Sequence, residues 1–232
     1  MKKTWLLALV LTMLASAFFN TARAEATTPT TKRAATTAWT EEGLQKAPAK
    51  EFDLAYITPG ASLVGYNQIL LGPIPVSFRR GWEKQAAIGS RLPINTKDVQ
   101  SIKDNLANVL REELTLQLNA GGYRLVDTAG EGVLEIDLSV VNLDVAAPDT
   151  PGASRARTYA VSAGEMTLVA ALRDAVTGTT IMRIYDHYVA RESFKPEQIR
   201  NGDNAQAAHE AAATWAAAIR RELDLAHGTD AR

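Results

Sequence analysis

The sequence predicts an α/β protein of the α+β kind: a two-layer sandwich in which two long helices cover one face of a mainly antiparallel sheet. Three observations lead to this prediction. In two long segments, apolar residues recur every three or four positions, which is the period of an amphipathic helix. Between these segments, apolar and polar residues alternate, as in a strand with one buried face. The order strand, helix, several strands, helix fits helices packed on one sheet.

The N-terminus has the pattern of a signal peptide. Residues 2–3 are lysines, an apolar run follows over 5–19, and residues 22–24 read Ala-Arg-Ala. Small residues at the first and third of these positions are typical of a cleavage site, so we expect cleavage between Ala24 and Glu25. The sequence therefore predicts an exported protein.

Composition excludes several classes of site. The chain has no cysteine, so it forms no disulfide, no thiolate metal site and no lipid anchor on a cysteine after the signal. It has 25 basic and 26 acidic residues, and loss of the signal removes three basic ones, which leaves 22 against 26 and a net charge of −4. A protein that binds nucleic acid through phosphates needs a basic surface, so we expect no nucleic-acid partner.

We expect four parts along the chain: a signal peptide (1–24), a flexible leader (25–50), a single α/β domain (51–228) and a short tail (229–232). The leader is rich in threonine and alanine and shows no sustained period, which is typical of a tether. Trp39 is the exception within it, because a large aromatic side chain can dock on the domain instead.

The domain begins with irregular elements. Residues Gln68 to Leu71 are predicted to form a strand that continues irregularly to Val76, with an edge or bulge near Pro73, since proline cannot donate a ladder hydrogen bond. The mixed segment from Arg79 to Ile94 is predicted to be a loop.

The two helices carry the clearest periods. The first is predicted from Thr96, which would cap it, to Asn119, before the glycine pair at 121–122. Its apolar stripe comprises Val99, Ile102, Leu106, Leu110, Leu114 and Leu118. The last helix is predicted over 204–226, with an inner stripe of Ala205, Ala208, Ala212, Trp215, Ile219, Leu223 and Ala226.

Strands fill the space between the helices. A short strand is predicted over 123–127, and residues 134–140 alternate apolar with polar side chains. A hairpin follows, with a first arm at 166–172, a turn at 174–179 and a return arm at 181–191. Gly178 in the turn can adopt positive φ.

Three pieces of the chain together resemble a known family. They are "YITPGASLVGY", then "LNAGGYRLVDTAGEGVLEIDLSVVNLD", and last "LRDAVTGTTIMR" before "AAATWAAAIRRELD". In this order and spacing they resemble the bacterial domain of unknown function 3313 family. The resemblance implies an exported envelope protein of a Gram-negative bacterium, with no assigned enzyme activity. Members of that family look mostly like lipoproteins, from which this chain departs because it lacks the cysteine.

One group of residues suggests a binding surface. Arg79, Arg80, Trp82 and Lys84 combine positive charges with a tryptophan, and exposed Trp and Arg are favoured at recognition sites. Such a set can hold anionic lipid headgroups or cell-wall glycan. The alternative is a solvated loop with Trp82 folded onto the core. We expect an envelope protein or a cell-wall component as partner, and peripheral membrane contact as a further mode.

Two groups suggest catalysis, and both have a plainer interpretation. Asp186 and His187 are neighbours on one strand, so their side chains should point to opposite faces and cannot form a Ser-His-Asp relay. Glu135 and Asp137 share the polar face of a strand, where acids also serve to solvate a sheet.

We therefore expect a non-catalytic, exported periplasmic accessory or binding protein, with no cofactor, no metal and no catalytic residue assigned. The alternative is a small exported hydrolase with a carboxylate or histidine site on the polar sheet face.

Overall fold

The computed structural model describes residues 28–87, 95–145, 158–160, 164–190, 197–199 and 201–228. The expected signal peptide, its cleavage site at Ala24 and Glu25, and the expected tail over 229–232 lie outside the described residues.

An eight-stranded sheet organises the described residues, in the order β1-β2-β9-β8-β6-β3-β5, with β4 beside β6. The strands are β1 (Gln45–Ala47), β2 (Leu54–Ile57), β3 (Gln68–Leu71), β4 (Val76–Phe78), β5 (Arg124–Leu125), β6 (Val133–Val145), β8 (Gly164–Asp174) and β9 (Thr180–Val189). The pairs from β1 to β6 along this order are antiparallel, whereas β3 runs parallel to β5 and β6, and β4 parallel to β6. A separate antiparallel pair joins β7 (Thr158–Ala160) to β10 (Glu197–Ile199).

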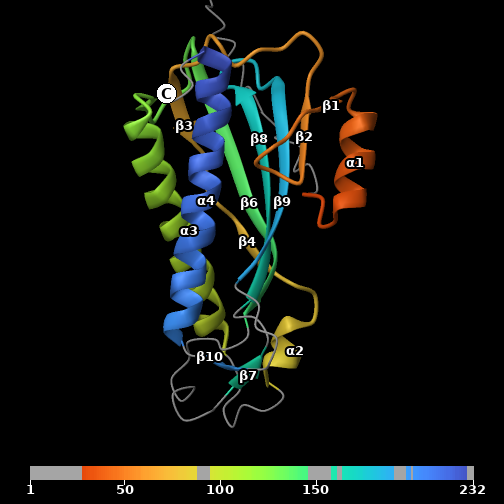
Figure 1. The fold of residues 1–232 in the computed structure, drawn as a ribbon, viewed down its shortest axis with the longest axis vertical. Coiled ribbons are helices and arrows are strands. Elements are labelled where there is room, and N and C mark those ends of the chain that lie inside the picture. Colours follow the sequence, from red (N-terminus) through yellow and green to blue (C-terminus); the bar gives the residue numbers. More distant parts are fainter. Residues whose placement is uncertain are drawn as a thin grey trace, which may run out of the picture.

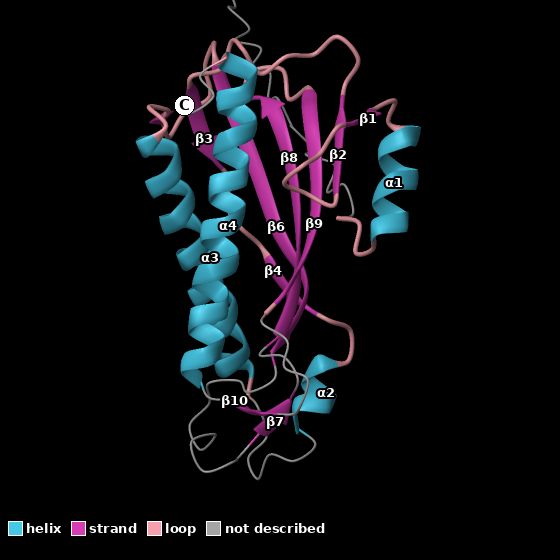
Figure 2. Cartoon of the chain, viewed as in Figure 1, coloured by secondary structure: helices cyan, strands magenta, loops and turns pink. Residues whose placement is uncertain are grey.

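Two long helices, α3 (Thr96–Ala120) and α4 (Asn201–His227), lie side by side on one face of the sheet (Figure 1). The short helix α1 (Lys32–Glu41) lies on the opposite face, and α2 (Trp82–Ala87) lies near β7 at one end of the molecule. The predicted class, a mainly antiparallel sheet with two long helices on one face, is confirmed. Figure 2 shows the same arrangement by type of secondary structure.

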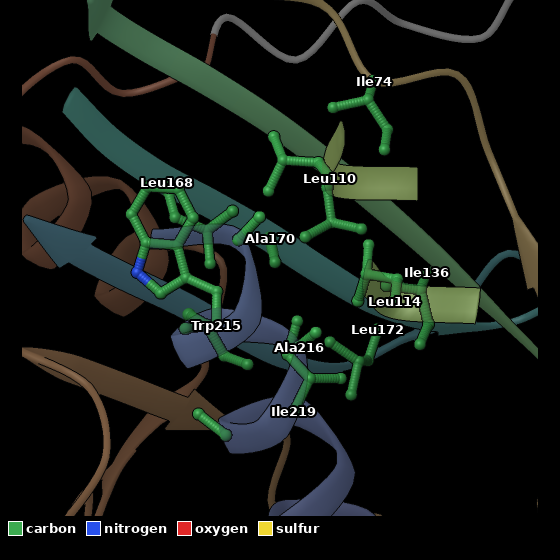
Figure 3. Packing of buried hydrophobic residues seen from close by; sticks show 14 of the residues in the cluster. Ile74, Leu110, Leu114, Ile136, Leu168, Ala170, Leu172, Trp215, Ala216 and Ile219 are labelled. Atoms are coloured by element: carbon green, nitrogen blue, oxygen red, sulfur yellow. The ribbon is translucent and has the colours of Figure 1, made fainter. Parts of the chain in front are cut away.

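The main core lies between the sheet and the two long helices. Helix α4 directs Trp215, Ala216 and Ile219 toward the sheet, where they meet Leu168 and Leu172 of β8 (Figure 3). Small alanines on α4 let the helix backbone approach the strands closely, and the tryptophan fills the remaining space. The predicted inner stripe of α4 is correct except at Ala205, which is exposed. This residue lies in the first turns of the helix, beyond the main core.

Helix α3 confirms the predicted stripe and corrects its cap. Asn95, not Thr96, is the N-cap: its side chain accepts from the Asp98 N–H, and the Asp98 carboxylate accepts from the Asn95 N–H. This reciprocal pair is a capping box. At the other end Gly122 has φ of 81°, a conformation that favours glycine.

The segment Arg79 to Ile94 is not simply a loop. Residues 82–87 form helix α2, and 88–94 lie outside the described residues. The loop prediction is therefore wrong for α2. Trp82, at the first position of this helix, is buried.

The flexible leader predicted over 25–50 is wrong where the structure describes it. Thr31 caps α1 by accepting from the Ala34 N–H, and Trp39 is fully buried. Trp39 packs with Tyr56, at 5.6 Å between ring centroids, and with Tyr185 in a second cluster on this face. The inward residues of α1 are the buried Ala35 and Trp39 and the partly buried Ala38. They span about one turn, which is too short to show a period in the sequence.

Strand β8 is buried on both faces. The alternation of apolar and polar residues predicted that one face of each strand is exposed to solvent. Strand β6 shows this pattern, whereas β8 is buried from Met166 to Leu172 without interruption. The cause is α1, whose cluster includes Val169 of β8 and Val141 of β6 on the face away from α3 and α4. The expected hairpin turn is present, with Gly178 at φ of 71°.

In the part of the chain that the structure describes, no helix combines the length and apolar character needed to cross a membrane.

Replacement of Trp39 tests whether α1 belongs to the folded unit. We expect Trp39→Ala to lower the free energy of unfolding by about 3–5 kcal/mol, because a buried aromatic side chain leaves a cavity on an otherwise covered sheet face. Urea unfolding monitored by circular dichroism measures it. The matched control, Thr37→Ala, changes an exposed residue of the same helix and should shift stability by no more than about 0.5 kcal/mol. Equal stability of both variants would mean that α1 is not part of the cooperative fold.

Candidate functional site: an apolar pocket beside α3 and α4

A pocket of about 200 Å³ lies between the two long helices and one end of the sheet. Its sheet side is the end of β6, the start of β8 and the end of β9, including Leu143, Val145, Met166 and Tyr188. Leu143 and Met166 are buried, so they form the floor.

The helix side of the pocket follows from two sequence patterns. On α3, Ile102, Leu106 and Val109 are spaced by four and three residues, which places them on one face. On α4, the facing residues are alanines at 205, 207 and 208. Because alanine side chains are short, they leave space where larger residues of α4, such as Trp215, fill the core farther along the helix.

Polar groups lie around this apolar interior. Asn105 of α3 and His209 of α4 line the pocket and are exposed. His209 lies 3.6 Å from the Glu113 carboxylate of α3, measured from Nδ1 to Oε1. On the sheet side, the Tyr188 hydroxyl lies 3.5 Å from Oε2 of Glu210.

The predicted binding residues Arg79 and Trp82 support the pocket rather than line it. The Trp82 ring stacks on Phe78 at 3.9 Å between centroids, and its Nε1–H donates to the Val145 carbonyl at 3.2 Å. Arg79 Nε donates to the Asp144 carboxylate at 2.6 Å. Both Asp144 and Val145 belong to the pocket wall, so these contacts fix the end of β6.

The hypothesis of an exposed recognition tryptophan is therefore wrong, since Trp82 is only 2% exposed. The plainer interpretation, with Trp82 folded onto the core, is the correct one. Arg80 and Lys84 are exposed and do not line the pocket. Binding through these two cations stays a prediction.

Asp186 and His187 point to opposite faces, as the strand geometry predicts. Asp186 accepts from Trp215 Nε1 at 2.8 Å and from the Asp53 N–H at 2.9 Å, so it joins α4 to the start of β2. Burial raises the pKa of Asp186 above its ordinary value of 3.8, although the Trp215 and Asp53 hydrogen bonds oppose this rise. Asp186 is thus a structural carboxylate.

His187 lies on the other face with Thr167 and Glu165. Thr167 Oγ1 is 3.3 Å from His187 Nδ1, and Glu165 Oε2 is 3.6 Å from His187 Nε2. A hydroxyl, an imidazole and a carboxylate in series resemble the parts of a nucleophilic site. Thr167, however, is only 1% exposed, so a substrate cannot reach its hydroxyl.

The carboxylates of β6 do not join His187. Asp137 pairs with Arg173 at 3.0 Å. Asp137 pairs in register with Ala171 of β8, and His187 pairs in register with Thr167 of the same strand. These two positions on β8 are four residues apart, which is roughly 13 Å at the usual strand rise. Glu135 lies two residues farther from His187 than Asp137 on the same strand. The groups required by the hydrolase alternative are therefore scattered. Within the described ranges, no three His, Asp or Glu side chains are grouped to hold a metal ion.

The family comparison covers most of the chain. The model of the family described as "Protein of unknown function (DUF3313)" matches residues 36–219. The chain belongs to this family. The resemblance found in the sequence is confirmed. The match begins inside α1 and includes residues 36–41 of this helix, a segment that was predicted to belong to a flexible leader. No curated protein matches this DUF3313 chain.

Solved structures with a distant likeness also exist. The PelC dodecamer from Paraburkholderia phytofirmans is 11% identical, with a TM-score of 0.35, over 72% of this chain and 96% of that one. A minor lipoprotein from Acinetobacter baumannii is 14% identical, with a TM-score of 0.33, over 69% and 92% of the two chains. A putative neuraminyllactose-binding hemagglutinin homolog from Helicobacter pylori is 10% identical, with a TM-score of 0.33, over 70% and 88%. At this level, the likenesses say nothing about what the DUF3313 chain binds.

Sequence reasoning missed the pocket. Its wall residues carry no catalytic motif, and they come from five elements that meet only in the fold. One signal was present: the start of α4 has alanines at the positions where its later turns have Trp215, Ile219 and Leu223. A helix that packs on a sheet with only small residues leaves a gap beside it.

The raised pKa of Asp186 gives a pH test. The folded state holds the Asp186 proton more tightly than the unfolded chain, so this group's contribution to stability is largest below about pH 3.8 and is lost as pH rises through the higher folded pKa. We expect the free energy of unfolding of the natural chain, minus that of Asp186→Asn, to decrease as the pH rises over this range. Urea titrations at successive pH values measure it, and a difference that stays constant or grows would contradict the assignment.

Proposed function

We propose that this DUF3313 protein is an exported, non-catalytic envelope protein that binds an apolar ligand group in the pocket beside α3 and α4. One observation carries the proposal: a pocket of about 200 Å³ that is lined mainly by apolar side chains. Concave, mainly apolar pockets with a few polar groups are the usual form of a ligand site.

The absence of a converging catalytic set in the described residues favours binding over chemistry. Thr167 is buried, and Asp137 is paired with Arg173 far from His187, so these groups do not converge on one site. An envelope protein or a cell-wall component that presents an apolar group is the expected partner. Contact of Arg80 and Lys84 with an anionic membrane surface is a secondary mode.

The N-terminal pattern supports export. We expect the protein purified from the periplasm to begin at Glu25, because the Ala22 and Ala24 side chains fit the small-residue pockets of a signal peptidase. N-terminal sequencing of the periplasmic fraction measures this. Ala24→Arg should block cleavage and leave the longer chain, whereas Thr27→Ala, beyond the site, should not. A full-length natural chain in the cytoplasmic fraction would contradict export.

Ligand binding is tested with an apolar fluorescent probe such as N-phenyl-1-naphthylamine. We expect saturable fluorescence enhancement with the natural chain and at least fivefold weaker binding with Ala205→Phe, because the exposed Ala205 lines the pocket and a large ring there fills it. Thr214→Phe is the matched control, since Thr214 is an exposed residue of α4 that does not line the pocket.

Equal probe binding by both phenylalanine variants and the natural chain would place the probe elsewhere on the surface. No saturable binding by the natural chain would remove the pocket as the functional site.

A further inference from the structure

We infer that Met166 sets the depth of the pocket and thereby determines the length of the apolar group that the pocket accepts. This inference rests on the proposed function and adds to it the residue against which the buried end of the ligand stops. The accepted group is an alkyl chain that enters between α3 and α4 and ends at the sheet.

The pocket has an outer and an inner end. Among its described lining residues, Asn105, Ala205 and His209 are exposed, and all three belong to α3 and α4. Leu143 of β6 and Met166 of β8 line it as well and are buried. A ligand therefore enters between the two helices, and its innermost part lies against the sheet.

The space between the helices has the width of a missing side chain. Ala205 and Ala208 line it where later turns of α4 carry larger residues. A gap left by short side chains is about as wide as the longer side chain that would fill it. An alkyl chain in such a gap touches both walls, and close contact on both sides gives the largest dispersion attraction.

Met166 lies in the middle of the inner end. On one side it pairs in register with Tyr188 of β9, which also lines the pocket. On the other side, the neighbouring strand β6 contributes Leu143. Methionine is unbranched and flexible, and such a side chain fills irregular gaps in a core. The outer part of the Met166 side chain therefore occupies the space that a longer ligand would need.

A β-bulge in β6 lies opposite Met166. The register of β6 with β8 shifts between residues 141 and 144, so that Asn142 and Leu143 together stand opposite Met166. Asn142 has φ of 55°, a left-handed conformation that asparagine adopts more readily than most residues, and its side chain donates to the Thr30 carbonyl. Leu143 packs in the main core with Met166. A bulge bends its strand, and this bend lies at the inner end of the pocket.

The test uses the straight-chain primary alcohols from pentanol to dodecanol, which share one neutral polar end and differ only in chain length. Each competes with the naphthylamine probe for the purified protein, below its own solubility limit. For the natural chain we expect the affinity to rise about fourfold with each added CH₂ group, because each group buries more apolar surface. The affinity should level off at the length at which the chain reaches Met166.

Two methionine variants assign the depth to one residue. We expect Met166→Ala to raise the length at which the affinity levels off by about two to three carbon atoms, because it removes the outer part of the side chain from the floor. Met182→Ala is the matched control and should leave this length unchanged. Met182 is a methionine of the same core, 4% exposed against 5% for Met166, and it does not line the pocket.

Thermal unfolding monitored by circular dichroism checks that each variant folds. If either alanine variant does not fold, Met166→Val and Met182→Val replace the pair. The expected shift for Met166→Val is then about one carbon atom, because valine removes less of the side chain.

The outcomes separate the inference from the proposed function. No shift with Met166→Ala, or an equal shift with Met182→Ala, would overturn the role of Met166 while the apolar site stands. An affinity that rises along the whole series without levelling off in the natural chain would overturn it too. If no alcohol displaces the probe, the proposed function fails as well.

Discussion

Strand β8 is buried on both faces, and the rest of the structure depends on this constraint. Its residues from Met166 to Leu172 are buried without a break. A strand buried on both sides needs a cover on each, and a sheet of this kind cannot be stable with α3 and α4 alone. The short helix α1 provides the second cover with Trp39. The fold is thus a two-layer sandwich with a small third layer over its middle strands.

Polar contacts then hold these layers in register. Asp186 joins Trp215 of α4 to the backbone of Asp53, next to β2. On the other face Arg183, a nearly buried cation of β9, pairs with Glu42 directly after α1 at 2.8 Å. Isolated buried charges are costly, so each of these groups is stable only when the layer that brings its partner is in place. The charges therefore make the packing of α1 and α4 specific.

The sequence contained most of the fold and little of the site. Long apolar periods predicted α3 and α4, because a helix of more than twenty residues that packs on a sheet must repeat its inner face many times. The turn at Gly178 was predictable from its residue types, since Asp174 accepts from the N–H groups of Val176 and Thr177. Helix α1 was not predictable in this way, because its inward residues span only about one turn and form no repeat. The burial of Trp82 was not predicted for a related reason. Neighbouring charges suggested exposure, while its hydrogen bond to the Val145 carbonyl depends on the pairing of β4 with β6, which the local sequence does not show.

The pocket forms where the side chains of neighbouring elements do not fill the space between them, so no sequence motif marks it. The same alanines that let α4 approach the sheet near Ala212 and Ala216 leave a gap near Ala205 and Ala208, where the ends of β6 and β8 no longer fill the space. Two hydrogen bonds anchor this end of the sheet: Arg79 donates to the Asp144 carboxylate, and Trp82 donates to the Val145 carbonyl. These residues were candidates for direct contact with a ligand. Their contacts instead connect them to one wall of the pocket, because Asp144 and Val145 both line it.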